Sequence, residues 1–323
     1  MRSFAVRSFA FASSLIIASV VSLAACGGDD DGGAAASPDG GGTSTTGNPS
    51  TNPGSSGDSG TDPGSDPNSG PSCTSAGESL APGVSAKTIS VGGSNRTYQL
   101  YVPSTFDGKK TYPLIFAFHG DGGDGTGLRK SFKIEAETKE GAIIVYPDGL
   151  NKTWDCDTTA GLARDTAFID AVVAELTKNA CADAARVYAT GFSRGAYFVN
   201  QMVCRSKSTW RAIATHSGGG PWGIEGTEYD AQGQLKCNAK QLAALQVQGL
   251  ADTTVPPSEG QKARDFWRAA DGCQSATEAY DPSPCQQYKG CAKPEVYCAI
   301  PGMQHTIWAS AAPVTWNFFT SQK

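Results

Sequence analysis

The sequence predicts an α/β fold, in which a mainly parallel sheet is covered by helices on both faces. Six short apolar runs are typical of strands buried on both sides. Between two of these runs, Phe168, Val172 and Leu176 recur at helical spacing, which predicts an amphipathic helix over residues 165–178. The region from 73 to 323, about 250 residues, is long enough for one such domain. The predicted strands are 114–118, 142–146, 187–190, 213–216, 243–249 and 296–300.

A further pair of strands is expected at the start of the sheet. Residues 87–91 and 96–102 flank the four residues Gly92-Gly93-Ser94-Asn95. Glycine and asparagine between two strand-like runs are typical of a tight turn. We therefore expect an antiparallel hairpin here.

The pentapeptide Gly191-Phe192-Ser193-Arg194-Gly195 follows the strand-like run 186–190 and precedes a helix-like run, 196–203. A serine on a sharp turn between a strand and a helix is held exposed, and the helix N-terminus favours developing negative charge. The alternative is an ordinary Gly/Ser turn. The context favours a nucleophile elbow with Ser193 as the nucleophile.

The acid and the base can be found by elimination. In the α/β-hydrolase arrangement both follow the serine, acid first. The chain has three histidines: His119 precedes Ser193, and no acidic residue lies between Ser193 and His216. His305 is therefore the predicted base. Asp252, directly after the predicted strand 243–249, is the predicted acid. The other aspartates after Ser193 are expected to be solvated: Asp230, Asp265, Asp271 and Asp281.

Acyl transfer also needs donors for a developing oxyanion. The predicted strand 114–118 ends in His119-Gly120-Asp121-Gly122-Gly123, which is similar to the glycine-rich loop that supplies one backbone N–H in esterases. The expected donors are the N–H groups of Asp121 and Arg194, with Gly122 as the alternative to Asp121. His119 is expected to order this loop rather than to transfer protons. The complete set predicts an α/β-hydrolase fold without a large lid.

Several stretches together resemble the feruloyl esterases of the secreted polyhydroxybutyrate-depolymerase-like group. The resemblance extends from about residue 73 to the end. Two departures are local: Arg194-Gly195-Ala196 follows Ser193 where the family often has Asn or Tyr and two glycines, and Met303-Gln304 replaces a glycine-rich lead-in to His305. The matching stretches are RTYQLYVP at 96–103, FAFHG at 116–120, YPDGL at 146–150, CAD at 181–183, RVYATGFS at 186–193, WRAIA at 210–214, DGC at 271–273, YKGC at 288–291 and the loop around His305.

The resemblance implies a serine esterase that needs no metal or organic cofactor and releases ferulic acid from plant cell-wall polysaccharide. Acetylxylan esterase and polyhydroxyalkanoate depolymerase are the alternatives, and a surface binding module on an esterase scaffold is the non-enzymatic one. Trp308, Trp154 and Phe192 are the candidate substrate-binding residues. Trp308 is the best placed, since it lies in the same loop as His305.

The first 72 residues are expected to serve export rather than the fold. Arg2 and Arg7 precede an apolar stretch over 9–23, as in a signal peptide over 1–25. Leu23-Ala24-Ala25-Cys26 resembles a bacterial lipobox, which predicts lipidation of Cys26. The alternative is an ordinary secretory signal. The remainder of 26–72 is rich in Gly, Ser, Pro and Asp and is a predicted linker. The expected location is exported and lipid-anchored at the cell surface or outer membrane, or secreted.

Charge excludes some partners. Of the 31 acidic residues, 7 lie in the linker, and 2 of the 26 basic residues lie in the signal, so residues 73–323 carry 24 of each sign. A neutral domain has no basic field for nucleic acid. The expected partners are a polysaccharide ester or polyester and, through the lipid alone, a membrane. The domain is expected to be a monomer.

Nine cysteines remain besides Cys26. In an exported protein they predict up to four disulfides and one leftover thiol. Cys291 with Cys298 and Cys181 with Cys204 are plausible local pairs, but the sequence does not fix the connectivity. A zinc site is the competing interpretation, but the spacings lack close cysteine pairs.

Overall fold

The computed structural model describes residues 73, 80–239 and 241–322. All of these belong to the second of two units into which the chain divides, residues 62–323. The predicted signal peptide, the predicted lipidation site Cys26 and the predicted linker to residue 72 lie outside the described residues. Within the described part of the chain, no helix is both long and apolar enough to span a membrane.

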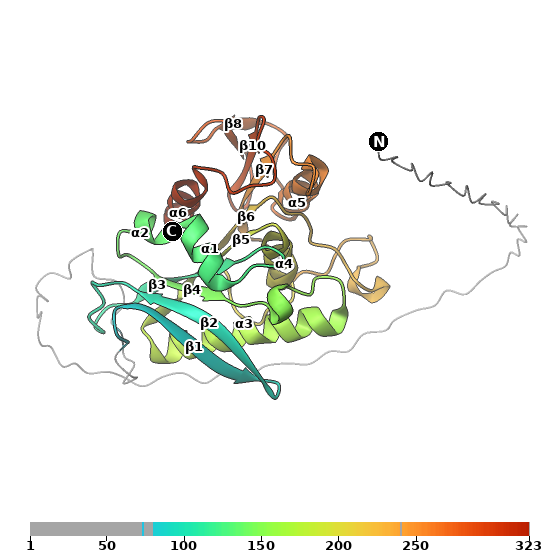
Figure 1. The fold of residues 1–323 in the computed structure, drawn as a ribbon. Helices are drawn as coiled ribbons and strands as arrows, with labels where there is room; N and C mark the ends of the chain where they lie inside the picture. The colour runs from blue at the N-terminus through green and yellow to red at the C-terminus, as the bar shows by residue number, and fades with distance from the viewer. Residues whose placement is uncertain (1–72, 74–79, 240, 323) are drawn as a thin grey trace, which may run out of the picture. The chain divides into compact units, whose positions relative to one another are not determined.

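One sheet runs through the described region (Figure 1). The strand order is β1-β2-β4-β3-β5-β6-β7-β10-β9-β8. The six central strands pair in parallel, whereas β1–β2, β2–β4, β10–β9 and β9–β8 are antiparallel. The strands are β1 (Gly83–Val91), β2 (Ser94–Val102), β3 (Tyr112–Phe118), β4 (Ile143–Pro147), β5 (Ala182–Phe192), β6 (Ala212–His216), β7 (Ala243–Gly249), β8 (Thr277–Ala279), β9 (Cys285–Tyr288) and β10 (Glu295–Ile300).

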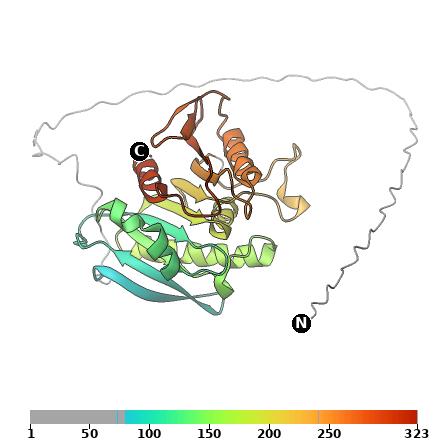
Figure 2. The ribbon, with the colours of Figure 1, turned by 45° about the horizontal axis from the view of Figure 1, so that its top comes forward.

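Helices cover both faces of this sheet. Buried side chains of α3, α4 and α5 share one core cluster with one face, and those of α1, α2 and α6 share a second cluster with the other. Figure 2 shows the sheet running between these helices, from the β1–β2 hairpin to the C-terminal strands. The helices are α1 (Gly125–Phe132), α2 (Ile134–Thr138), α3 (Thr159–Asn179), α4 (Arg194–Val203), α5 (Pro257–Ala270) and α6 (Ala311–Ser321), with single turns η1 (Leu150–Lys152) and η2 (Gly226–Glu228).

The predicted α/β class with a mainly parallel sheet is confirmed. Each of the six predicted central strands corresponds to an observed one, although β5 begins five residues earlier than expected and other ends shift by one or two residues. The predicted crossover helix begins six residues earlier than expected, because the Thr158 hydroxyl caps it by accepting from the Gly161 N–H at 3.1 Å. The predicted hairpin is present but tighter: Val91 pairs with Ser94, and Gly92 and Gly93 alone turn, at φ of 57° and 78°.

Four disulfides join the described cysteines, and both expected pairs are wrong. Cys181 bonds to Cys73 rather than to Cys204, and Cys298 bonds to Cys285 on the neighbouring strand rather than to Cys291. Nearness in sequence misled because paired elements bring distant cysteines together: the Cys73–Cys181 bridge spans 108 residues. The other bridges are Cys204–Cys237 and Cys273–Cys291, and Cys156 is the buried leftover thiol. Four disulfides are typical of an exported protein, and this chain is one.

One of the aspartates expected to be solvated is buried. Asp271 is 2 % exposed at the end of α5, where its carboxylate accepts from the Leu242 N–H at 3.4 Å. The expectation of a solvated carboxylate was wrong because the chain folds Leu242 and Lys293 over this helix end. Asp230, Asp265 and Asp281 are exposed as expected.

Candidate active site

Ser193 stands on a sharp turn at the carboxyl end of β5, where α4 begins. Its backbone has φ 54° and ψ −122°, a conformation that a residue with a side chain rarely adopts. The turn is held by the Ser193 N–H, which donates to the His216 carbonyl at 2.9 Å. A side chain at Gly191 would collide with the backbone of Gly195, and one at Gly195 with the Phe118 carbonyl. Both glycines are therefore required by the close approach of helix and strand.

Three strand ends bring Ser193, His305 and Asp252 together. Asp252 follows β7, and His305 lies in the loop between β10 and α6. His305 Nε2 lies 2.9 Å from Ser193 Oγ, and His305 Nδ1 lies 2.8 Å from Asp252 Oδ2. The Asp252 side chain is completely buried, whereas that of His305 is 20 % exposed. The arrangement can carry a proton from the serine hydroxyl to the imidazole beside a buried carboxylate.

Backbone donors hold the Asp252 carboxylate in place. Its Oδ1 accepts from the N–H groups of Thr254 and Val255, each at 2.9 Å. Its Oδ2 is thereby left to face His305. Sequence reasoning did not identify these two donors, although an aspartate that starts a turn commonly bonds to the backbone two residues further on.

The loop after β3 lies against the serine. A Cβ at Gly120 would lie 3.2 Å from Ser193 Cβ. Among the described residues, the N–H groups of Asp121 and Arg194 have no hydrogen-bond partner, so both can donate to a ligand. The alternative donor Gly122 is wrong, because its N–H already donates to the Lys152 carbonyl at 2.8 Å. The Asp121 residue is exposed.

His119 holds this loop from beneath. It is 2 % exposed, its Nε2 accepts from the Gly149 N–H at 2.9 Å, and its Nδ1 lies 2.7 Å from the Gly120 carbonyl. These partners require the neutral ring with the proton on Nδ1. Burial lowers the pKa of His119, which also favours the neutral form. His119 therefore orders the loop, as expected.

The expectation that Trp154 contacts substrate is wrong. Trp154 is completely buried, stacked on Phe198 with ring centroids 4.7 Å apart. Its Nε1–H donates to the His119 carbonyl at 3.0 Å. The large ring packs into the core below the loop because that position satisfies both its apolar surface and its single donor.

The Arg194 side chain ties the elbow to the Trp154 segment. Its Nε donates to the Trp154 carbonyl at 2.8 Å, and its guanidinium pairs with the Asp157 carboxylate. Through Trp154 this contact continues to the His119 carbonyl. Arg194 thus connects the start of α4, which carries its own free N–H group, to the Trp154 segment that bonds to the loop of Asp121. Sequence reasoning used only the backbone of Arg194, because its partner is 37 residues away.

A pocket of about 620 Å³ opens beside His305. Phe192 and Trp308, both predicted to bind substrate, line it together with Ile307. The Phe192 ring also lies against the His305 imidazole, with centroids 4.9 Å apart. Lys133 and Glu137 contribute charged groups to the same pocket. The pocket is of a size that takes a small organic group.

The chain is similar to known esterases in both sequence and structure. None of the protein-family models searched matches the chain. Feruloyl esterase C from Emericella nidulans is 30 % identical over 241 residues, which cover 69 % of this chain and 83 % of that protein. A relative from Aspergillus niger is 29 % identical over 240 residues, with the same coverage of each chain. The solved structure of an acetyl xylan esterase from Aspergillus awamori superposes with a TM-score of 0.57 at 20 % identity, covering 73 % of this chain and 99 % of that one. This last similarity shows a shared fold.

Proposed function

The chain belongs to the feruloyl esterase family and is a carboxylic ester hydrolase, and we propose that it releases ferulic acid from esters on plant cell-wall polysaccharide. The observation that carries the proposal is the pair of hydrogen bonds that runs from Ser193 Oγ through His305 to Asp252, at 2.9 and 2.8 Å. Family membership supports the substrate class, since the relative with 30 % identity is named a feruloyl esterase.

The proposed reaction is a two-step acyl transfer. His305 Nε2 takes the Ser193 proton as Oγ attacks the ester carbonyl, and Asp252 orients and stabilises the imidazolium. The alcohol leaves with the proton from His305, and the acyl group stays on Ser193. Water, activated by the same histidine, then releases the acid.

The proposed oxyanion hole consists of the N–H groups of Asp121 and Arg194. Both are unpaired among the described residues. Asp121 lies in the loop that packs against Ser193, and Arg194 follows Ser193 directly at the start of α4. Donors of this kind stabilise the tetrahedral intermediate more than the ester, by about 3–4 kcal/mol each.

The pocket beside His305 supports a bulky acyl group over an acetyl group. A volume of about 620 Å³ far exceeds what an acetyl group fills, and the Phe192 and Trp308 rings can stack on an aromatic ring. Acetylxylan and polyhydroxyalkanoate esters are the substrates that this reasoning ranks lower.

Hydrolysis of methyl ferulate beside 4-nitrophenyl acetate tests the proposal, with Ser193→Ala as the control. We expect turnover of both, reduced roughly 10⁴-fold or more in the variant. Cleavage of the acetate alone would contradict the feruloyl assignment, and labelling by a fluorophosphonate would still report a reactive Ser193. Activity on neither ester would favour a binding module.

We further propose that residues 1–25 are a lipoprotein-type signal, that Cys26 is lipidated, that 26–72 is a linker and that 73–323 is a monomeric esterase domain. The four disulfides in the described residues support passage through an oxidising compartment. Mass spectrometry of the membrane fraction would detect the lipid on Cys26. Cys26→Ala should shift the protein from the membrane to the soluble fraction, and an unchanged distribution would contradict anchoring.

A further inference from the structure

A second cavity, of about 790 Å³, lies apart from Ser193, between α5 and the segment that joins β6 to β7. We name it the flank groove and define it by Pro221, Tyr229, Gln234, Lys236, Phe266 and Ala269. Figure 1 shows this connecting segment beside α4 and α5. None of the residues placed around Ser193 lines the groove, so the proposed hydrolysis leaves it unexplained.

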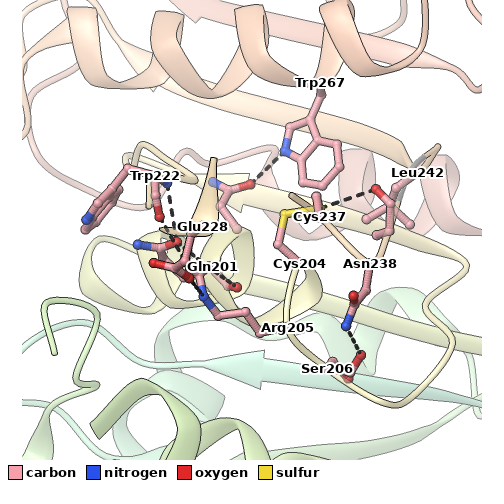
Figure 3. Close-up of a disulfide and its surroundings, with 12 residues drawn as sticks. Gln201, Cys204, Arg205, Ser206, Trp222, Glu228, Cys237, Asn238, Leu242 and Trp267 are labelled. Atoms are coloured by element: carbon pink, nitrogen blue, oxygen red, sulfur yellow. Dashed lines mark hydrogen bonds and ion pairs between the residues drawn. A yellow bond between two sulfur atoms is a disulfide. The ribbon is translucent and has the colours of Figure 1, made fainter. Parts of the chain in front are cut away.

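The wall of the groove is held rigidly to α4 and the residues that follow it. The Cys204–Cys237 disulfide fixes one end (Figure 3). Arg205 Nε donates to Glu228 Oε1 at 2.9 Å, and its NH2 donates to the Trp222 carbonyl at 3.0 Å. The second Glu228 oxygen accepts from the Glu225 N–H at 3.0 Å. A segment with this many cross-links keeps its shape without a ligand, which lowers the entropy lost on binding.

Tyr229 presents an immobilised ring to the groove. Its hydroxyl accepts from the Gly223 N–H at 2.9 Å, and the ring packs so closely on Gly223 that any Cβ there would collide with it. The residue is nevertheless 37 % exposed, one of four large hydrophobic residues with that degree of exposure in the described chain. Phe266 lies across the groove on α5. Fixed aromatic rings at a surface are suited to stack on the apolar faces of flat, polar ligands.

The polar groups of the groove suit a neutral, hydroxyl-rich ligand. Asp230 and Lys236 both line it and carry opposite charges. Asp230 Oδ1 already accepts from the N–H of Gln234, and Lys236 Nζ donates to the Thr227 carbonyl at 3.1 Å. The exposed Gln234 also lines the groove, and a side-chain amide can both donate and accept. An anionic or cationic ligand would gain little from this balanced pair.

Helix α4 relates the groove to the nucleophile. Ser193 immediately precedes the helix, and Arg205, which anchors the groove wall, lies just beyond its other end. Ten helical residues rise about 15 Å. A ligand in the groove is therefore too far from Ser193 to be the group that reacts.

We propose that the flank groove binds a stretch of neutral polysaccharide chain, several sugars away from the ester that Ser193 cleaves. The inference rests on the proposed function for the identity of the polymer. Tyr229 and Phe266 stack on sugar rings, and Gln234 exchanges hydrogen bonds with their hydroxyls. The groove thus retains the polymer while esters along it reach the catalytic residues.

Two measurements on the full chain test the proposed polysaccharide site: binding of the polymer and hydrolysis of its esters. Arabinoxylan freed of its esters by alkali is the binding probe, and native gel retardation of the Ser193→Ala protein is the readout. We expect Tyr229→Ala to weaken the affinity measured by retardation roughly two- to tenfold, the range of one aromatic contact. Tyr229→Phe should retain the affinity of the parent protein. In the active enzyme Tyr229→Ala should lower kcat/KM on feruloylated arabinoxylan by the same factor and leave methyl ferulate unchanged.

Two further variants keep the test decisive. Ala269→Gln fills the groove from the exposed face of a helix and should have the same effect if Tyr229→Ala fails to fold. Val84→Ala, an exposed apolar residue on the distant edge strand β1, is the matched control. Unchanged retardation and an unchanged ratio of polymer to methyl ferulate activity in the groove variants would overturn the inference. Loss of methyl ferulate activity in the parent protein would instead overturn the proposed function.

Discussion

Buried acidic residues lie near both ends of strands β7 and β10. Those at the carboxyl end and those at the amino end differ in whether their oxygens have hydrogen-bond donors. At the carboxyl end, Asp252 is buried with both oxygens hydrogen-bonded, to two N–H groups and to His305. At the amino end, Glu295 opens β10 completely buried, with neither oxygen partnered among the described residues. Its neighbour Asp271 has one unpartnered oxygen.

The lack of donors favours the neutral form of the two acids at the amino end. Ionised carboxylates in a protein interior need donors, and without them burial favours the neutral acid. Burial raises the pKa of Asp271 from 3.8 to about 6, although the Leu242 and Lys293 backbone and the Lys293 charge oppose the shift. Burial and the nearby Asp271 raise the pKa of Glu295 well above its usual range, against the opposing charge of Arg268. A buried acid in this protein is suited to a catalytic role only where the loop after β7 supplies N–H donors, as it does for Asp252.

The largest expected contrast is between two Asp→Asn substitutions. Asp252→Asn should lower kcat roughly 10⁴-fold, because an amide favours the wrong histidine tautomer. Asp271→Asn should leave kcat within about twofold, since it touches none of the reacting groups. Steady-state hydrolysis of methyl ferulate measures both. Similar losses in the two variants would remove the distinction between the two ends.

Arg194 tests how far the order around Ser193 depends on its supports. Arg194→Gln keeps the backbone N–H but loses the link to Asp157, so the two proposed oxyanion donors should misalign. We expect kcat to fall roughly 10–10²-fold, the cost of a small misplacement, with KM little changed. Arg194→Lys should recover part of the loss. An unchanged kcat with a lowered melting temperature would show that the Arg194 side chain contributes to stability alone.

The amino end should make stability depend on pH. Because the folded-state pKa of Asp271 is raised, the folded protein binds more protons than the unfolded chain between about pH 4 and 6, and the free energy of unfolding falls as pH rises through that window. The loss is about 3 kcal/mol, because the pKa of Asp271 rises from 3.8 to about 6 and each pKa unit corresponds to about 1.4 kcal/mol. Urea unfolding at several pH values measures it.

Matched variants test whether Asp271 and Glu295 cause this pH dependence of stability. The double variant Asp271→Asn/Glu295→Gln should flatten the decline, whereas Asp265→Asn, an exposed carboxylate on the same helix, should not. A slope that survives the double variant would place its source elsewhere.

The smallest effect is expected in the pocket beside His305. Trp308→Ala removes a ring from its wall, so kcat/KM for methyl ferulate should fall roughly two- to tenfold relative to 4-nitrophenyl acetate. Trp316→Ala, a partly buried tryptophan on α6 outside that pocket, is the control. An equal loss of kcat/KM on both esters would mean that Trp308 supports the His305 loop and does not contact the acyl group.

Local patterns predicted much of the fold. Strands such as β4, with its continuous apolar run, and the turn at Ser193 depend on neighbours in sequence, so the spacing of apolar side chains and the placement of glycine predict them. The pairing of Cys73 with Cys181 and the burial of Trp154 could not be predicted in this way. Both depend on which distant segments pack together, and the local sequence around each residue is compatible with many other pairings and packings.

The sequence by itself determined the six central strands, the crossover helix between two of them, the position of Ser193 between a strand and a helix, and the short list of histidines and aspartates from which His305 and Asp252 come. The tertiary structure alone decided that Gly122 N–H is occupied, that the Arg194 side chain joins the start of α4 to the Trp154 segment, and that Asp271 is buried while Asp265 is solvated. The physical reason is range: backbone preference acts over a few residues, whereas hydrogen-bond satisfaction and burial are properties of the assembled core.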